Sequence, residues 1–238
     1  MTQHTVEDIT TEKGNQLFLV RPAGPSGAAV MWLHWFDEAP NANRTQFLDE
    51  AKAMADRGVT SVLPQLTFPW QSPPTDIESD RARIESEKEL LVGAYQTLKA
   101  CNGVDPSRVG MVGHDFGAMH GMNLFGEVEL AAAVLVAATP RWSDWFLRFW
   151  TIDSDRYDYM RALSVVDPIT TVTRADFPLL FQFGDTDFYI APMTGLELYN
   201  AAPEPKRLLS YDSGHDMGSA EITKDRTAFL TQHLGLGP

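Results

Sequence analysis

The sequence has little positive charge and no long apolar run. Its 19 Lys and Arg residues are outnumbered by 32 Asp and Glu residues, which gives a formal net charge of −13. Because binding to phosphates requires a surplus of basic residues, this balance argues against nucleic acids and anionic membrane surfaces as partners. No stretch of roughly 18 apolar residues occurs, and the N-terminal residues include no apolar segment. We therefore expect a chain that neither crosses a membrane nor is exported.

Cysteine is almost absent as well. Cys101 is the only one, so no internal disulfide can form, and no Cys/His cluster has the spacing of a zinc site. The sequence thus predicts no disulfide framework, no metal and no cofactor. A reducing cytoplasm fits this composition.

The order of apolar and amphipathic segments predicts an α/β fold. With 238 residues and 44% hydrophobic residues, the chain is long enough for one domain with a large core. Strand-like and helix-like segments alternate, which favours a mostly parallel sheet covered by helices on both faces. The expected strands are Gln16 to Val20, Ala28 to His34, Thr60 to Leu66, Arg108 to Gly113, Leu130 to Ala137, Pro178 to Phe183 and Arg207 to Tyr211. The expected helices are Arg44 to Arg57, Ile77 to Ala100, Phe116 to Leu124, Pro192 to Ala201 and Ser219 to Leu234.

Residues 139–167 interrupt this alternation with a run rich in Trp and Tyr. We interpret the run as a small helical insertion. Its aromatic side chains either pack into the core, as aromatic runs commonly do, or cover a substrate, and both roles are compatible. The domain prediction is one domain over 1–238 with a cap over about 139–167.

A short motif in the middle of the chain predicts a nucleophile at the edge of the sheet. Gly113-His114-Asp115-Phe116-Gly117 lies between a predicted strand and a predicted helix. Glycines are needed where the chain reverses so tightly that side chains would clash, and such a turn lifts its central side chain above the sheet edge. An ordinary strand-to-helix turn is the alternative interpretation.

Two further groups follow later strands in the order acid then histidine. Asp187 lies in Gly184-Asp185-Thr186-Asp187 after one strand, and His215 follows the last strand. Open α/β sheets place their sites at these strand ends. We prefer Asp187 to Asp185 as the partner of His215, because its spacing from Gly184 lets it reach back toward the histidine. Asp185 and Asp216 are interpreted as turn or capping residues.

With these residues assembled, the chain resembles the α/β-hydrolase superfamily along nearly its whole length, and its dienelactone-hydrolase-like members in size. The resemblance implies an eight-stranded fold or a slight truncation of it. Leu33-His34-Trp35-Phe36 matches the oxyanion loop, with Trp35 where glycine is usual. By that match the backbone N–H groups of Phe36 and Phe116 form the oxyanion hole.

Asp115 stands where most members of the superfamily have serine and dienelactone hydrolases have cysteine. A carboxylate is ionised at neutral pH but attacks esters poorly, so it suits displacement at saturated carbon. Epoxide hydrolases and haloalkane dehalogenases, which resemble this chain in having aspartate here, form an alkyl ester on it. By that similarity His215 activates water to cleave the ester, and Asp187 holds the imidazole.

Several side chains are candidates for contact with a small-molecule substrate. Tyr157 and Tyr159 are candidate acids for epoxide opening, and Trp142, Trp145 and Trp35 are candidate halide donors. Phe116 follows the nucleophile where dehalogenases usually have tryptophan, so epoxide ranks above halide. The full set of candidates is His34, Trp35, Trp142, Trp145, Tyr157 and Tyr159.

The sequence is also compatible with two other functions. One is hydrolysis of an activated ester, lactone or thioester, as in dienelactone hydrolases, with Asp115 acting as a base or in an unusual acyl mechanism. The other is ligand binding or a lyase-like reaction on a scaffold that has lost hydrolytic activity. The oligomeric state is not predicted.

Overall fold

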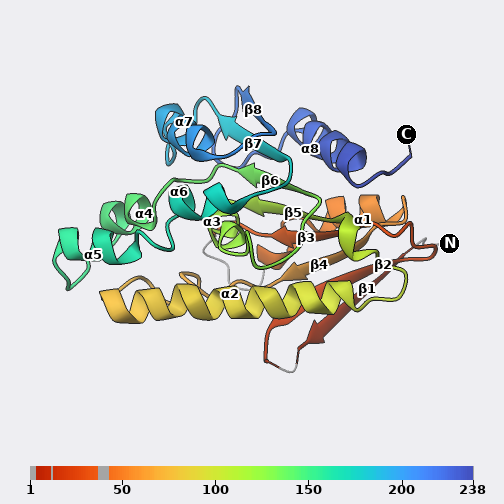
Figure 1. Cartoon of the computed structure of the whole chain (residues 1–238), viewed down its shortest axis with the longest axis horizontal. Helices are drawn as coiled ribbons and strands as arrows, with labels where there is room; N and C mark the ends of the chain where they lie inside the picture. Colours follow the sequence, from red (N-terminus) through yellow and green to blue (C-terminus); the bar gives the residue numbers. More distant parts are fainter. Residues whose placement is uncertain (1–3, 12, 37–42, 238) are drawn as a thin grey trace.

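A central eight-stranded sheet organises the protein. The computed structural model describes residues 4–11, 13–36 and 43–237. The strand order is β1-β2-β4-β3-β5-β6-β7-β8, as Figure 1 shows from one side. The strands are β1 His4–Thr10, β2 Gln16–Pro22, β3 Ala29–Leu33, β4 Thr60–Pro64, β5 Val109–His114, β6 Ala132–Val136, β7 Leu179–Gly184 and β8 Lys206–Tyr211.

Six of these strands, β3 to β8, run parallel to one another, and β2 is antiparallel to both of its neighbours. Every residue of β3 to β7 is buried, which explains why these segments are apolar without alternation. Since β5, β7 and β8 are parallel, the residues that follow them gather at the same edge of the sheet. This arrangement places the functional residues.

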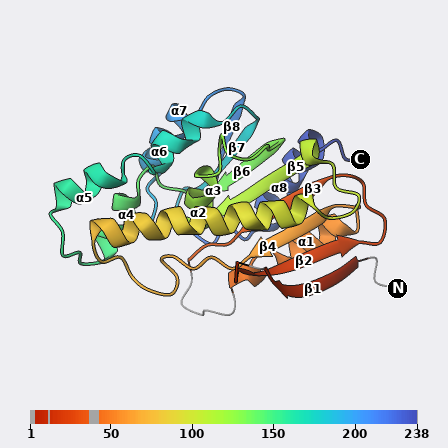
Figure 2. The ribbon, with the colours of Figure 1, turned by 60° about the horizontal axis from the view of Figure 1, so that its bottom comes forward.

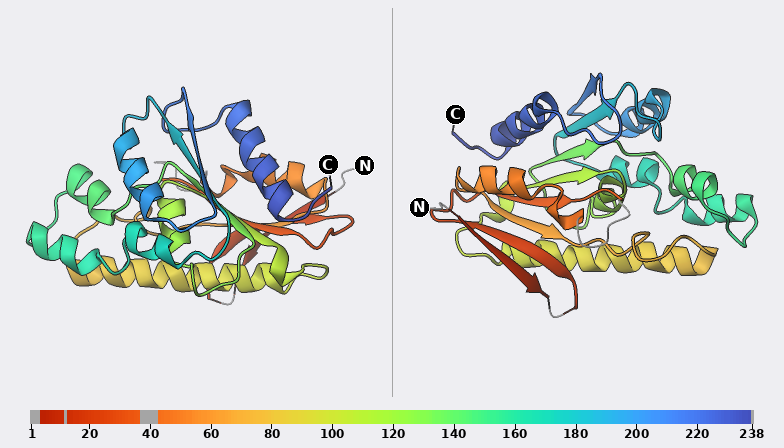
Figure 3. Two further views of the ribbon diagram at one scale, coloured as in Figure 1. Left: turned by 45° about the horizontal axis from the view of Figure 1, so that its top comes forward. Right: turned by 180° about the vertical axis from the view of Figure 1, so that it is seen from behind.

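Helices cover both faces of the sheet (Figure 3). On β5, Gly110 faces Leu230 of α8 and the next residue, Met111, lies against Gly121 of α3, so these two helices pack on opposite faces. Arg226 of α8 forms a bidentate ion pair with Glu50 of α1, which holds these two helices together. The helices are α1 Leu48–Ala55, α2 Ile77–Lys99, α3 Phe116–Met122, α4 Trp142–Phe149, α5 Arg156–Leu163, α6 Pro168–Thr171, α7 Pro192–Ala201 and α8 Ala220–His233, with short 3-10 turns at Asn43–Thr45, Pro106–Arg108 and Val172–Arg174.

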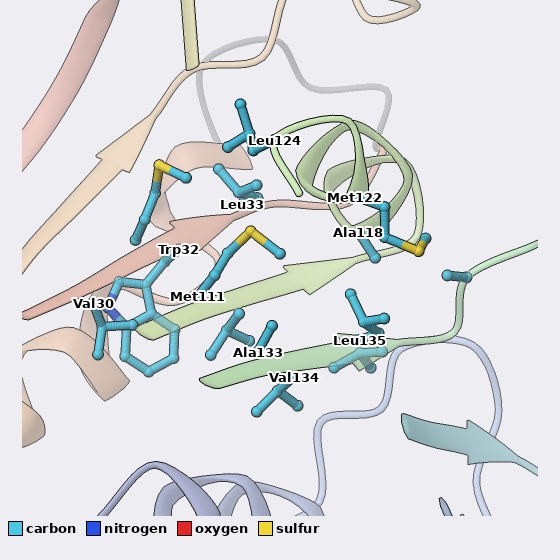
Figure 4. Packing of buried hydrophobic residues seen from close by; sticks show 14 of the residues in the cluster. Val30, Trp32, Leu33, Met111, Ala118, Met122, Leu124, Ala133, Val134 and Leu135 are labelled. Carbon is cyan, nitrogen blue, oxygen red and sulfur yellow. The ribbon is translucent and has the colours of Figure 1, made fainter. Parts of the chain in front are cut away.

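The core forms two layers, one on each face of the central strands. In Figure 4, Leu33 and Met111 lie with Met122 on the side of α3, and Trp32 and Val134 lie on the other side. All five side chains are at most 1% exposed. Alternate residues of each strand therefore contribute to different layers, as the pleat of a strand requires.

The seven predicted strands and the predicted α/β class are confirmed, with strand ends shifted by at most two residues. The sequence prediction missed β1, which pairs with β2 at the edge of the sheet (Figure 2). Its residues HTVEDIT are mostly exposed, and Glu7 pairs with Arg21 across the two strands. A polar edge strand lacks the apolar pattern by which strands are recognised, and its charges discourage pairing with other chains.

The segment 139–167 contains α4 and α5. Helix α5 packs against α2 and α4, and Asp155 caps its N-terminus by accepting hydrogen bonds from the backbone of Tyr157 and Asp158. Helix α4 carries the aromatic side chains that reach the site. In the described ranges, no helix combines the length and apolar character that crossing a bilayer requires.

Candidate active site

Asp115 lies at a strained turn between β5 and α3. Its backbone has φ 52° and ψ −118°, a conformation that side-chain-bearing residues rarely adopt. A Cβ at Gly113 would lie 2.6 Å from the Cα of Ala118, and one at Gly117 would collide with the carbonyl of Leu33. Glycine is therefore required on both sides of Asp115. The turn holds the Asp115 side chain at the edge of the sheet, where it is 1% exposed.

His215 lies between two carboxylates. Its Nδ1 is 2.8 Å from Oδ2 of Asp187, and its Nε2 is 3.6 Å from Oδ2 of Asp115. The other oxygen of Asp187 accepts hydrogen bonds from the backbone N–H groups of Tyr189 and Ile190. The Asp187 carboxylate is thereby held in place to accept a hydrogen bond from the protonated Nδ1 of His215. Nε2 is then the ring nitrogen that faces Asp115.

The two carboxylates set the charge of the imidazole. Burial acts to lower the pKa of His215, but Asp115 and Asp187 outweigh it and raise that pKa to about 9. Burial also raises the pKa of Asp115, against the lowering effect of His215 and of nearby backbone N–H groups. At neutral pH the site therefore carries an imidazolium between two acidic groups.

The backbone N–H groups of Phe116 and Phe36 lie beside the Asp115 carboxylate and act to lower its pKa. Oδ1 of Asp115 is buried and forms no hydrogen bond of normal geometry within the described ranges. The Phe116 amide comes from the turn between β5 and α3, and the Phe36 amide comes from the loop after β3. They flank the position where negative charge would develop on an ester of Asp115.

A cavity of about 570 Å³ opens onto these groups. Aromatic rings form most of its wall and enclose His215: the Trp35 ring stacks on the imidazole at 5.8 Å, and the Tyr189 ring meets it edge-on at 5.1 Å. No Lys or Arg side chain lines it among the described residues. The lining consists of Trp35, Phe36, Asp115, Trp145, Phe149, Trp150, Tyr189 and His215.

Solved structures share this architecture. The chain is similar to an esterase domain from Rhodothermus marinus, with 17% identity, 98% of this chain and 100% of that chain covered, and a TM-score of 0.68. It is also similar to the α/β hydrolase GrgF from Penicillium sp. sh18, with 17% identity, coverage of 98% and 99%, and a TM-score of 0.71. A third similar structure is an acetyl xylan esterase from Paenibacillus sp. R4, with 15% identity, 98% of this chain and 89% of that chain covered, and a TM-score of 0.73. This chain has the α/β-hydrolase fold.

Comparison of the sequence itself gives no match. No protein-family model matches it, and no curated protein does. The α/β-hydrolase fold is therefore shown by structure, at identities too low to carry an activity across.

Within this α/β-hydrolase fold, the predicted residues separate into two groups. The structure brings together Asp115, Asp187 and His215, and it places Asp185 against Ser210 instead. Four other predicted residues reach the same place, since Phe36, Trp35 and Trp145 line the cavity and Phe116 supplies a flanking amide.

The structure places the candidate acids Tyr157 and Tyr159 away from the cavity. Tyr157 is 82% exposed, and Tyr159 is fully buried with its hydroxyl donating to Oδ2 of Asp80 at 2.8 Å. Side chains two positions apart on a helix point to nearly opposite sides. Helix α5 packs the side that carries Tyr159 against α2. Neither ring lines the cavity.

Trp142 and His34 also lie outside the cavity lining. The Trp142 indole is buried and donates to the backbone oxygen of Val166 at 3.0 Å. His34 is 2% exposed, and its Nε2 accepts a hydrogen bond from the backbone N–H of Leu66 at 2.9 Å. Burial lowers the pKa of His34 to about 4, so it is neutral. Both residues stabilise the loops around the site.

Sequence reasoning missed Tyr189, Phe149 and Trp150 as cavity residues. Tyr189 comes two residues after Asp187, beyond the end of β7, so the rule that located Asp187 would also have found it. Among the described residues, no group of three or more His, Cys, Asp or Glu side chains is arranged to hold a metal ion.

Replacing Asp187 by Asn should lower the pKa of His215. Asp187→Asn removes one of the two charges that raise it, so we expect a fall of roughly one to three pH units, measured by NMR titration of the imidazole. Because the pKa of His215 exceeds its ordinary value of 6.5, its pairing stabilises the folded protein fully below that value, and this stability is lost as pH rises through about 9. Asp187→Asn should reduce that loss.

Asp185→Asn is the matched control, since Asp185 lies on the same turn but contacts Ser210. It should leave the titration of His215 unchanged. Equal effects of the two substitutions would show that the pairing seen here does not govern the histidine.

Proposed function

We propose that this protein is a hydrolase in which Asp115 is the nucleophile, His215 the general base and Asp187 the group that orients the base. The observation that carries the proposal is the position of the His215 ring between the two carboxylates, at the strained turn that opens onto the cavity. The fold is consistent with it, because the similar structures named above include two esterases. We propose a small molecule as the substrate.

The proposed first step is displacement at a saturated carbon. An ionised carboxylate is a weak nucleophile toward carbonyl groups but attacks a strained ring carbon. Asp115 forms a C–O bond to one epoxide carbon while the bond from that carbon to the ring oxygen breaks. The ring oxygen takes a proton, and an alkyl ester of Asp115 results.

Tyr189 is our proposed donor of that proton. It is the tyrosine that lines the cavity, and its ring lies 5.1 Å from the imidazole of His215. It takes the role that the sequence assigned to Tyr157 and Tyr159. The aromatic wall favours an epoxide with an uncharged, apolar substituent.

The proposed second step depends on the loss of charge at Asp115. Once Asp115 is an ester, it no longer raises the pKa of His215, so the imidazolium releases its proton and Tyr189 is restored. Neutral His215 then takes a proton from water, whose oxygen adds to the ester carbonyl carbon between the amides of Phe36 and Phe116. The ester bond breaks, the departing oxygen takes the remaining water proton, and the Asp115–His215 pair is regenerated.

The site fits a haloalkane substrate less well than an epoxide. Halide release needs N–H donors, and the indole of Trp142 is already bonded to the backbone of Val166. Trp35 and Trp145 are the predicted donors that remain within the cavity wall, and Phe116 follows Asp115 where dehalogenases usually have tryptophan. We therefore place epoxide ahead of halide.

Hydrolysis of an ester, lactone or thioester is the second candidate. The similar structures include esterases, and the amides of Phe36 and Phe116 flank the site as an oxyanion hole would. In that reaction Asp115 and His215 together would activate water for direct attack on the substrate carbonyl. No covalent link to Asp115 would form.

Isotope labelling separates these two mechanisms. One turnover in water enriched in oxygen-18 should place the label in the Asp115 carboxylate if an alkyl ester forms and is cleaved at its carbonyl carbon. Peptide mass analysis locates it. Label found in the product alone, with none at Asp115, would contradict the covalent mechanism and favour direct hydrolysis.

Tyr189→Phe tests the identity of the leaving group. Losing the acid should slow epoxide opening by roughly 10²- to 10⁴-fold, while turnover of substrates with good leaving groups should change little. Stopped-flow rates of ester formation on Asp115 provide the measurement. Tyr157→Phe, which alters an 82% exposed ring, is the control and should behave as the parent; equal epoxide rates in the two variants would remove Tyr189 from the mechanism.

A further inference from the structure

Three hydrogen bonds join the oxyanion loop, the turn between β5 and α3, and the loop that carries His215. The backbone N–H of Trp35 donates to Oε1 of Gln46 at 2.8 Å. The Gln46 side-chain amide is 2.6 Å from Nδ1 of His114, the residue before the nucleophile. Nε2 of His114 is 2.8 Å from the backbone oxygen of His215. These contacts link Trp35 and Gln46 to His114, 68 positions after Gln46, and through His114 to His215, a further 101 positions along the chain.

The direction of each bond is fixed by the chemistry. Because Oε1 of Gln46 accepts from Trp35, its NH₂ group faces His114, and Nδ1 of His114 must accept. The proton of the ring is then on Nε2, which donates to the carbonyl of His215. Burial keeps His114 neutral by lowering its pKa well below the ordinary value, and the charges of His215 and Arg226 act in the same direction.

Trp35 is held from its other side as well. Its backbone oxygen accepts from Nδ1 of His34 at 2.7 Å, and its indole stacks on the rings of His114 and His215 at 5.1 Å and 5.8 Å. The N–H of the next residue, Phe36, is one of the two amides beside Asp115. Fixing Trp35 therefore fixes the direction of an oxyanion donor.

We infer that Gln46 and His114 are positioning residues that hold the Phe36 amide and the His215 backbone at fixed positions relative to Asp115. The inference rests on the proposed function, which supplies the reaction that these two residues serve. Attack by Asp115 on the substrate does not use the oxyanion donors or the base, whereas hydrolysis of the ester uses both. Loss of the network should therefore slow the second step selectively.

Gln46→Met removes the two side-chain hydrogen bonds described above for Gln46 with little change in side-chain length. Hydrolysis of the alkyl ester should fall about 10- to 100-fold, which is less than the roughly 10²- to 10³-fold effect of deleting an oxyanion donor outright. Formation of the ester should change less than threefold, so the covalent intermediate should accumulate. Stopped-flow and quench measurements give the two rates separately.

Gln182→Met is the matched control. Gln182 is fully buried and donates to Tyr211 and Ile222, away from the site. This variant should lose stability while the ratio of the two rates stays that of the parent. If Gln46→Met slows both steps in the same proportion, or leaves both unchanged, the positioning role is wrong.

Amide hydrogen exchange tests the network without any substrate. The backbone N–H of Trp35 should exchange faster in Gln46→Met than in the parent, and Gln182→Met should leave it unchanged. An unaltered exchange rate at Trp35 in Gln46→Met would overturn the inference whatever the enzyme acts on. Faster exchange at Trp35 combined with no alkyl ester on Asp115 would instead retain the network and reject the proposed function.

Discussion

The site depends on one backbone conformation, the positive φ of Asp115. Residues with side chains avoid this region, so it persists only where surrounding contacts impose it. Here β5 leads into the turn, α3 follows it, and the glycines at 113 and 117 allow the backbones of α3 and β3 to approach closely. The result is a carboxylate that is nearly inaccessible to bulk solvent yet lies at the floor of a cavity.

A buried carboxylate is costly unless it is paired, and its pairing determines the chemistry of the site. His215 supplies the compensating charge, and its own charge is sustained by Asp115 and Asp187. The charge of His215 therefore depends on the state of Asp115. In the proposed mechanism, chemical change at Asp115 alters the basicity of His215, so the base becomes active only when an ester is present to be cleaved.

Much of this arrangement could be predicted from the sequence. Parallel buried strands have a clear apolar signature, and side chains that follow such strands meet at one edge of the sheet, so Asp115, Asp187 and His215 could be grouped without coordinates. The side chains of α5 could not be placed, because which face of a short helix packs inward depends on its partner. Asp80 of α2 holds the Tyr159 hydroxyl, and nothing in the local sequence around Tyr159 signals this contact. The polar edge strand β1 and the bridging role of Gln46 escaped prediction for similar reasons, since each depends on a distant segment.

The central claim is that Asp115 becomes covalently linked to the substrate and that His215 is the base that releases it. His215→Gln mixed with an aryl-substituted epoxide, followed by intact and peptide mass spectrometry, tests this most directly. The account predicts a stoichiometric mass increase equal to that of the epoxide, located on Asp115 and persisting because hydrolysis lacks its base. Product release by this variant at the parental rate, with Asp115 unmodified throughout, would contradict it.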